Sequence, residues 1–197
     1  ITVLLFATMG GYKAPVSEAA TGQMSLYGIY LKADKGLESV AEEENEYGDA
    51  VIMESGGEYL LMDTGSYFTS EALYGALSKK GITNLSVYIS HLHPDHYANI
   101  DDHNPASYGI TIDKLYLPDK SIGSDWVSEN GGTTHTAYSR LLGRYGNTDT
   151  EIIYLKKGST FKVGDVKAEV LGPVGKYDMD LCNSYFPYAV YGEKSGH

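Results

Sequence analysis

Three histidines and an aspartate occur within six residues, in the stretch His91-Leu92-His93-Pro94-Asp95-His96. The preceding run at residues 85–90 contains the β-branched residues Val87 and Ile89, so it predicts a largely buried strand. Pro94 cannot donate a hydrogen bond to a sheet, so the strand has to end before it and the polar side chains are expected on a loop. The chain must therefore fold so that one strand end presents imidazole and carboxylate groups together.

These side chains are typical ligands of a metal ion. Neutral imidazole and carboxylate are preferred by borderline divalent metals such as zinc. His91 and His93 should point the same way, because side chains of an extended stretch alternate with a period of two. After the turn at Pro94, Asp95 and His96 approach from a second direction, which suits two neighbouring metal positions better than one closed tetrahedral site. The alternative is a solvated polar loop.

A second apolar run, at residues 58–62, ends in Asp63-Thr64-Gly65. An aspartate and a glycine at a strand end commonly make a turn, and this is one interpretation. The other is that Asp63 anchors the histidine-rich loop and orients a metal-bound imidazole through a hydrogen bond.

In this order, the two motifs resemble those of metallo-β-lactamase-fold hydrolases. The matching residues are Leu60-Leu61-Met62-Asp63-Thr64-Gly65 and Ile89-Ser90-His91-Leu92-His93-Pro94-Asp95-His96. Residues 46–54 resemble the Gly-Asp-Ala-hydrophobic entry strand of one branch, which includes competence-type DNA-uptake hydrolases and cell-wall phosphorylcholine esterases. Later motifs of that branch are resembled by Leu171-Gly172-Pro173, Cys182-Asn183-Ser184 and Tyr191-Gly192-Glu193-Lys194. The resemblance spans residues 24–194.

The resemblance implies an α/β fold, a metallo-β-lactamase-like αββα sandwich in which two sheets pack face to face and helices cover the outsides. It implies that His91 and His93 bind a first zinc ion and that Asp95 and His96 bind a second, with one or two ions in all and Mn²⁺ or iron as alternatives. As the catalytic residue, Asp95 would also orient the attacking water. Asp63 would lie behind these ligands.

The activity implied by the resemblance is zinc-dependent hydrolysis of a phosphodiester or phosphorylcholine-type ester, in a small-molecule or cell-surface substrate. One alternative is hydrolysis of a lactam, lactone or thioester, although no histidine stands directly after Leu171-Gly172-Pro173, where those branches carry a ligand. Another is a non-catalytic metal-binding surface domain. The bridging aspartate and distal histidine of the family do not occur before His197. We therefore expect the N-terminal part of a longer hydrolase, incomplete at its C-terminus, with weak metal binding and low or absent activity.

Composition narrows the class of partner. The 197 residues are enough for one domain with a core, and their net charge of −11 argues against a surface that binds polyanions. No basic stripe interleaved with aromatic residues occurs, so a nucleic-acid partner is not expected. Cys182 is the single cysteine, which excludes an intramolecular disulfide.

The N-terminal segment has two interpretations. The apolar run Ile1–Met9, followed by small and polar residues, resembles a secretory signal with Ser17 and Ala19 at the cleavage positions. The run is shorter than the ~20 residues that span a bilayer, so no membrane span is expected. We therefore expect a signal remnant at residues 1–20, the hydrolase-like domain at 21–197, and a secreted or cell-surface protein, with the cytoplasm as the alternative. The other interpretation is an ordinary first strand.

Hydrophobic periodicity and turn residues predict the remaining elements. Strands are predicted at 24–31, 50–54, 59–62, 114–117, 151–155, 161–163 and 166–170, and helices at 70–80 and 137–145. Hairpin turns are predicted at Gly56-Gly57 and Gly164-Asp165, and a short helical stretch should follow the histidine motif and break near Pro105.

Three histidines lie outside the motif. His103 is expected at the surface of a helix end, with the metal pocket as the alternative. His135 is expected in a loop or a first helical turn, with a substrate contact as the alternative. His197 has a metal-ligating role only as its lesser alternative.

Overall fold

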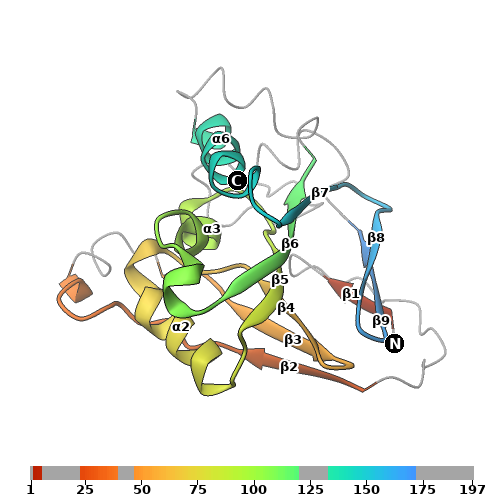
Figure 1. Ribbon diagram of the computed structural model, residues 1–197, viewed down its shortest axis with the longest axis horizontal. Helices are drawn as coiled ribbons and strands as arrows, with labels where there is room; N and C mark the ends of the chain where they lie inside the picture. The colour runs from red at the N-terminus through yellow and green to blue at the C-terminus, as the bar shows by residue number, and fades with distance from the viewer. Residues whose placement is uncertain (1, 6–22, 40–46, 120–132, 172–197) are drawn as a thin grey trace, which may run out of the picture.

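A computed structural model describes residues 2–5, 23–39, 47–119 and 133–171 of the chain. Its larger sheet has six strands in the order β2-β3-β4-β5-β6-β7 (Figure 1). The strands are β2 (Met24–Gly28), β3 (Val51–Ser55), β4 (Glu58–Met62), β5 (Asn84–Tyr88), β6 (Thr111–Pro118) and β7 (Glu151–Leu155). Strands β2, β3 and β4 are antiparallel, whereas β4 to β7 run parallel to one another.

Helices connect the parallel strands. They are η1 (Tyr67–Thr69) and α2 (Ser70–Lys79) between β4 and β5, α3 (Pro94–Asp101) and η2 (Pro105–Tyr108) between β5 and β6, and α6 (Thr133–Tyr145) before β7. Parallel strands need such crossovers, because the chain has to return to the end of the sheet where the strands begin before it can form the next one. The carboxyl ends of β4 and β5 consequently lie side by side, with Met62 paired with Tyr88.

A smaller sheet has three described strands in the order β1-β9-β8. They are β1 (Thr2–Leu5), β8 (Thr160–Val163) and β9 (Val166–Val170). Strands β8 and β9 form the predicted hairpin, and β1 pairs parallel with β9. Thr2–Leu5 therefore forms the first strand that the sequence left as an alternative to a secretion signal. Residues 6–20 lie outside the described residues, and export stays a prediction.

Two apolar cores flank the six-stranded sheet. One joins the sheet to helices α2, α3 and α6, with fully buried Leu73, Val87, Leu115 and Leu141 among its members. The other lies between the two sheets, where Met53, Leu60 and Tyr116 pack near Phe161 and Val166. Figure 1 shows the helices on one side of the large sheet and the small sheet on the other.

The predicted α/β fold with two sheets face to face is confirmed. Among the described residues the layers are helices, large sheet and small sheet. The predicted hairpin at Gly56-Gly57 and the predicted helix at 70–80 are also present, the helix ending at Lys79.

Three predicted boundaries differ from the structure by three residues or more. Strand β2 ends at Gly28 rather than at residue 31, because Gly28 pairs with Val51, where β3 begins. Strand β6 starts at Thr111, since Thr111 already pairs with Asn84 of β5. Helix α6 starts at Thr133, four residues before its predicted first residue.

The described part of the chain contains no helix that is both long and apolar enough to cross a membrane.

We predict that Leu115→Ala lowers the free energy of unfolding by about 2–5 kcal/mol, because Leu115 is 0% exposed in the centre of the sheet and its removal leaves a cavity. Leu26→Ala is the matched control, since Leu26 lies on edge strand β2 and is 52% exposed. Urea denaturation of both variants measures the difference. Equal losses in the two variants would contradict the assigned core.

Candidate metal centre

The candidate site forms where β4 and β5 end. Asp63 follows Met62 of β4 directly, and its backbone N–H donates to the carbonyl of Tyr88, the last residue of β5, over 2.8 Å. The histidine motif begins three residues after Tyr88. Because the two strands are parallel and adjacent, both segments leave the sheet at the same edge. The topology thus brings together two motifs that are separate in the sequence.

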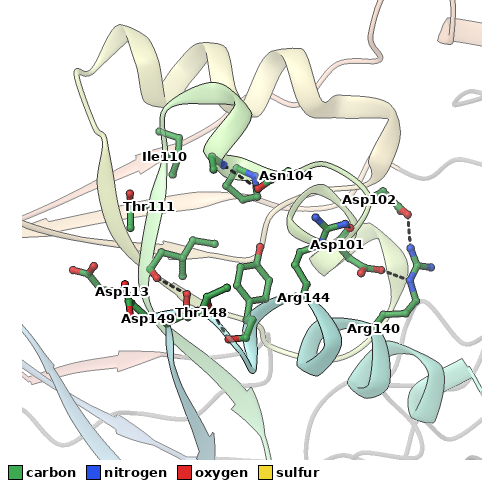
Figure 2. A pocket seen from close by; sticks show the side chains of 15 residues that line it. Asp101, Asp102, Asn104, Ile110, Thr111, Asp113, Arg140, Arg144, Thr148 and Asp149 are labelled. Atoms are coloured by element: carbon green, nitrogen blue, oxygen red, sulfur yellow. Dashed lines mark hydrogen bonds and ion pairs between the residues drawn. The ribbon is translucent and has the colours of Figure 1, made fainter.

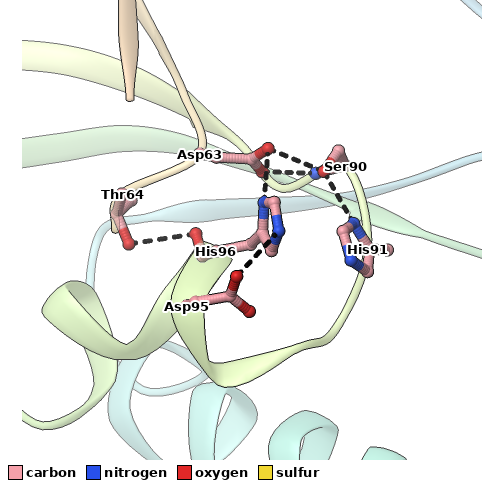
Figure 3. Close-up of polar contacts among 6 residues, drawn as sticks. All are labelled: Asp63, Thr64, Ser90, His91, Asp95 and His96. Carbon is pink, nitrogen blue, oxygen red and sulfur yellow. Dashed lines mark hydrogen bonds and ion pairs between the residues drawn. The ribbon is translucent and has the colours of Figure 1, made fainter. Parts of the chain in front are cut away.

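The carboxylate of Asp63 is the centre of a hydrogen-bond network (Figure 3). Its Oδ1 accepts from the backbone N–H of Ser90 at 2.7 Å, and its Oδ2 accepts from the Ser90 hydroxyl at 2.7 Å. Oδ2 also lies 2.9 Å from Nδ1 of His96. Asp63 adopts a left-handed backbone conformation with φ 55°, which costs a non-glycine residue roughly 1–2 kcal/mol. A strained residue held by three contacts points to a positional requirement at this site.

Ser90 is a site residue that sequence reasoning missed. Its hydroxyl lies between the Asp63 carboxylate and Nδ1 of His91, 3.0 Å from that nitrogen. The position next to His91 was the available signal, but a serine at the end of a strand has many ordinary roles.

Asp95 and His96 lie in the first turn of helix α3, which corrects the expectation that these residues lie on a loop. Pro94 occupies the start of the helix, where its missing N–H has no partner to lose, and His93 is the N-cap residue. The Asp95 carboxylate also gains from the partial positive charge at a helix N-terminus. The carbonyl of His96 accepts from the backbone and the side chain of Thr64, at 2.8 and 3.1 Å.

The structure brings the four predicted ligands together. The ring centre of His91 is 4.7 Å from that of His93 and 4.0 Å from that of His96. Nε2 of His96 is 3.4 Å from Oδ2 of Asp95. All four side chains are partly buried, while the intervening Leu92 is buried in the core. The histidines around Leu92 therefore project away from the core, as a period of two predicts.

Local charges and burial set the protonation of these groups. Burial lowers the pKa of His91 well below its usual value, and the neighbouring imidazoles His96 and His93 lower it further. Burial would also lower the pKa of His96, but hydrogen bonds to Asp63 and Asp95 outweigh it and raise this pKa to about 10. Burial would raise the pKa of Asp95, yet the hydrogen bond with His96 lowers it. At neutral pH, His91 is thus neutral and Asp95 is a carboxylate.

The chemistry of this donor set fits a divalent metal such as zinc. The Nδ1 atom of His91 faces the Ser90 hydroxyl, and that of His96 faces the Asp63 carboxylate. A metal ion would therefore bind to Nε2 of each ring. A carboxylate behind Nδ1 is the usual way to orient a metal-binding imidazole. As the side chains stand, no three His, Cys, Asp or Glu residues of the described ranges have donor atoms arranged to hold a metal ion. Side chains would have to rotate to bring three donor atoms around one ion.

Close backbone contacts support the site from behind. An added Cβ on Gly48, where φ is +72°, would lie 1.7 Å from the carbonyl oxygen of Asp95, so only glycine fits. Buried Asn99 of α3 donates to the Thr64 carbonyl at 2.6 Å and to Thr69 at 3.1 Å. Asn99 was also missed by sequence reasoning, because a polar residue in a short helix gives no distinctive pattern.

The other candidate residues lie elsewhere or outside the described residues. His103 follows α3, and its Nε2 is 3.0 Å from the carbonyl oxygen of Tyr67, which agrees with a helix-end position. His135 lies in the first turn of α6, but its side chain is outside the described part of the structure. The motifs at 172–173, 182–184 and 191–194, together with Cys182 and His197, are also outside it.

No family model and no curated protein matches the sequence. Among solved structures, the chain is similar to a putative metallo-β-lactamase from Thermotoga maritima, with 15% identity, TM-score 0.46, and 71% of this chain and 62% of that one covered. It is also similar to a diphosphatase of the PhnP family, with 15% identity, TM-score 0.41, and 72% of this chain and 53% of that one covered. A third similar structure is the metallo-β-lactamase fold protein YhfI from Bacillus subtilis, with 20% identity, TM-score 0.41, and 72% of this chain and 50% of that one covered. The chain thus spans between 50% and 62% of these three solved chains.

We predict that Gly48→Ala destabilises the protein by about 1–3 kcal/mol more than Gly109→Ala does, because the added methyl group overlaps the Asp95 carbonyl. Gly109 is a matched control: its φ is also +72°, and nothing lies within 4 Å of an added Cβ there. Thermal denaturation of both variants measures the effect, with each change in stability expressed as a free energy of unfolding at the same temperature. If both substitutions cost the same, the Gly48–Asp95 contact does not support the site.

Proposed function

We propose that this chain carries the metal centre of a zinc-dependent hydrolase. The observation that carries the proposal is the group of three imidazoles and one carboxylate at the adjoining ends of β4 and β5, with His96 oriented by Asp63. Partly buried histidines beside carboxylates that fix their orientation are the arrangement that catalytic zinc sites use. In this proposal, His91, His93, Asp95 and His96 hold one or two ions, with Mn²⁺ or iron as alternative metals.

When bound, a divalent metal supplies positive charge that polarises an ester oxygen and lowers the pKa of water from about 15.7 to about 7. The residues of this chain supply the geometry. Neutral His91 offers a lone pair, and Asp63 holds the His96 ring so that Nε2 faces the site. In this proposal the Asp95 carboxylate would accept a hydrogen bond from the attacking water and so orient it.

The proposed substrate is a phosphodiester or phosphorylcholine-type ester, in a small molecule or on a cell surface. This rests on the resemblance of the two site motifs to metallo-β-lactamase-fold hydrolases, and of residues 46–54 to one branch of them. The net charge of −11 supports a small ester over a nucleic acid. Secretion belongs to the same proposal and rests on the N-terminal apolar run.

A second candidate function is non-catalytic metal binding. It is supported by the same four donor side chains, because holding an ion requires ligands but no further group that acts on a substrate. The two functions differ in one measurable respect: only the hydrolase turns over an ester once metal is bound.

We predict that zinc binds the chain and that His93→Ala weakens binding by at least about tenfold, because it removes one bond of ~2.0–2.1 Å to the ion. His103→Ala is the matched control, since this imidazole bonds to Tyr67 away from the cluster. Elemental analysis after dialysis and a competitive chelator titration measure the affinities. Zinc binding that is equal in the two variants would refute the assigned ligands.

For activity, the chain is assayed on bis-p-nitrophenyl phosphate, p-nitrophenyl phosphorylcholine and nitrocefin, with and without chelator. We expect the chain to hydrolyse a phosphate ester, and we expect this activity to be lost with chelator and in His93→Ala. Turnover of nitrocefin alone would show that the substrate is a lactam and not a phosphate ester. Metal binding without any turnover would favour the non-catalytic function, and chelator-resistant turnover would refute the metal mechanism.

We further predict that Asp63→Asn weakens zinc binding by ~10–100-fold, the usual effect of a changed partner behind a ligand. Asparagine tolerates the left-handed backbone, so the substitution mainly removes the charge that faces Ser90 and His96. Asp34→Asn is the control, because Asp34 likewise accepts from a serine hydroxyl (Ser70, 2.5 Å) and a backbone N–H (Glu71, 2.7 Å). The idea fails if both variants bind zinc equally well.

A further inference from the structure

Helix α3 carries two proposed ligands but is only eight residues long, from Pro94 to Asp101. Isolated helices shorter than ~12–15 residues are marginal in water, so α3 depends on contacts with its surroundings. The last four carbonyls of any helix lack partners within the helix. In α3 these belong to Ala98, Asn99, Ile100 and Asp101.

Side chains from two other helices satisfy three of these carbonyls. The hydroxyl of Tyr74, on α2, donates to the carbonyl of Asn99 at 2.6 Å. The hydroxyl of Tyr145, on α6, donates to the carbonyl of Ile100 at 2.7 Å, and the guanidinium of Arg144 donates to that of Asp101. The remaining carbonyl, of Ala98, accepts from the backbone N–H of Asp102 at 2.7 Å. The carboxyl end of α3 is therefore fixed to both neighbouring helices.

A further ion pair strengthens the connection to α6. Arg140 Nε lies 2.6 Å from the buried carboxylate of Asp101, and the same guanidinium also pairs with Asp102. Figure 2 shows Arg140 reaching both carboxylates, with Arg144 beside Asp101, in the wall of a hollow of about 850 Å³. These contacts lie at the carboxyl end of α3, the same helix whose first turn carries Asp95 and His96.

The two tyrosines are well suited to a permanent structural role. Both are buried, with 3% of Tyr74 and 6% of Tyr145 exposed. Burial raises the pKa of each phenol, so each keeps the proton that it donates. At the other end of α3, His96 is bound to Thr64 and Asp63. A helix of eight residues is about 12 Å long and stiff, so a shift at its carboxyl end reaches its first turn.

We propose that Tyr74 and Tyr145 are positioning residues for the metal centre: they hold α3 where His96 faces both Asp63 and Asp95. The nature of the bound group rests on the proposed function, whereas the position of His96 does not. The hydroxyls act through the helix and touch neither metal nor substrate. Removing one leaves a buried carbonyl without its donor and loosens the end of the helix.

The test compares Tyr145→Phe with Tyr138→Phe. Tyr138 is also a buried tyrosine of α6, and its hydroxyl donates over the same 2.7 Å to a backbone carbonyl, but that carbonyl belongs to Pro118 of β6. Each variant therefore loses one buried hydroxyl, and only Tyr145→Phe releases α3. Tyr74→Phe releases α3 from the α2 side and serves as the second variant if Tyr145→Phe does not fold.

Two readouts separate this proposal from the proposed function. In the metal-free protein, NMR signals of the His96 ring nitrogens and hydrogen exchange of the α3 amides report the position of the helix. With Co²⁺ as the probe, the visible spectrum and a titration report the metal site. We expect Tyr145→Phe to shift the His96 signals, speed α3 exchange and weaken Co²⁺ binding by about tenfold or more, with Tyr138→Phe close to the parent in all three.

If Tyr145→Phe and Tyr138→Phe leave the His96 signals equally unchanged, or alter them equally, the positioning role is refuted. If the parent protein binds no Co²⁺, the proposed function fails, and the NMR comparison alone decides the positioning role. Parent-like Co²⁺ affinity in both Tyr145→Phe and Tyr74→Phe, with a parent-like spectrum, would also refute it.

Discussion

The Asp63 carboxylate is the interaction on which the arrangement of the site depends. It accepts from the backbone and hydroxyl of Ser90 and contacts Nδ1 of His96, so it joins the end of β4, the segment after β5 and helix α3. Hydrogen bonds to a charged acceptor contribute roughly 1.5–3 kcal/mol each, more than the roughly 1–2 kcal/mol cost of its left-handed backbone. Without this carboxylate, His96 would lose its orientation and the loop would lose its anchor.

The rest of the fold keeps this network in a fixed position. The parallel pairing of β4 and β5 sets the two motifs at one sheet edge, and Gly48 allows the backbone of the preceding segment to approach Asp95 closely. Helix α3 is held at its first turn by Thr64 and at its last turn by side chains of α2 and α6. A site built on short elements thus gains rigidity from partners behind the side chains that would bind an ion.

Much of the fold could be predicted from local patterns. Strands β3 to β5, β7 and the β8–β9 hairpin are apolar runs bounded by turn residues, and helix α2 has a clear apolar face. The errors at the ends of strands occurred where pairing, rather than composition, sets a boundary, as at Gly28 and Thr111. The first residues of α3 were taken for a loop because Pro94 ends a strand, yet the same proline is favourable at the start of a helix.

The sequence by itself determined the chemical groups of the site and the strand end that carries them, since three imidazoles and a carboxylate lie within six adjacent residues. The tertiary structure decided which groups orient them. Ser90 lies 27 residues from Asp63 and Tyr145 lies 45 residues from Ile100, so no local period relates these partners. Hydrogen bonds require donor and acceptor within about 3 Å, and only the packing of the sheet and three helices fixes such distances between remote segments.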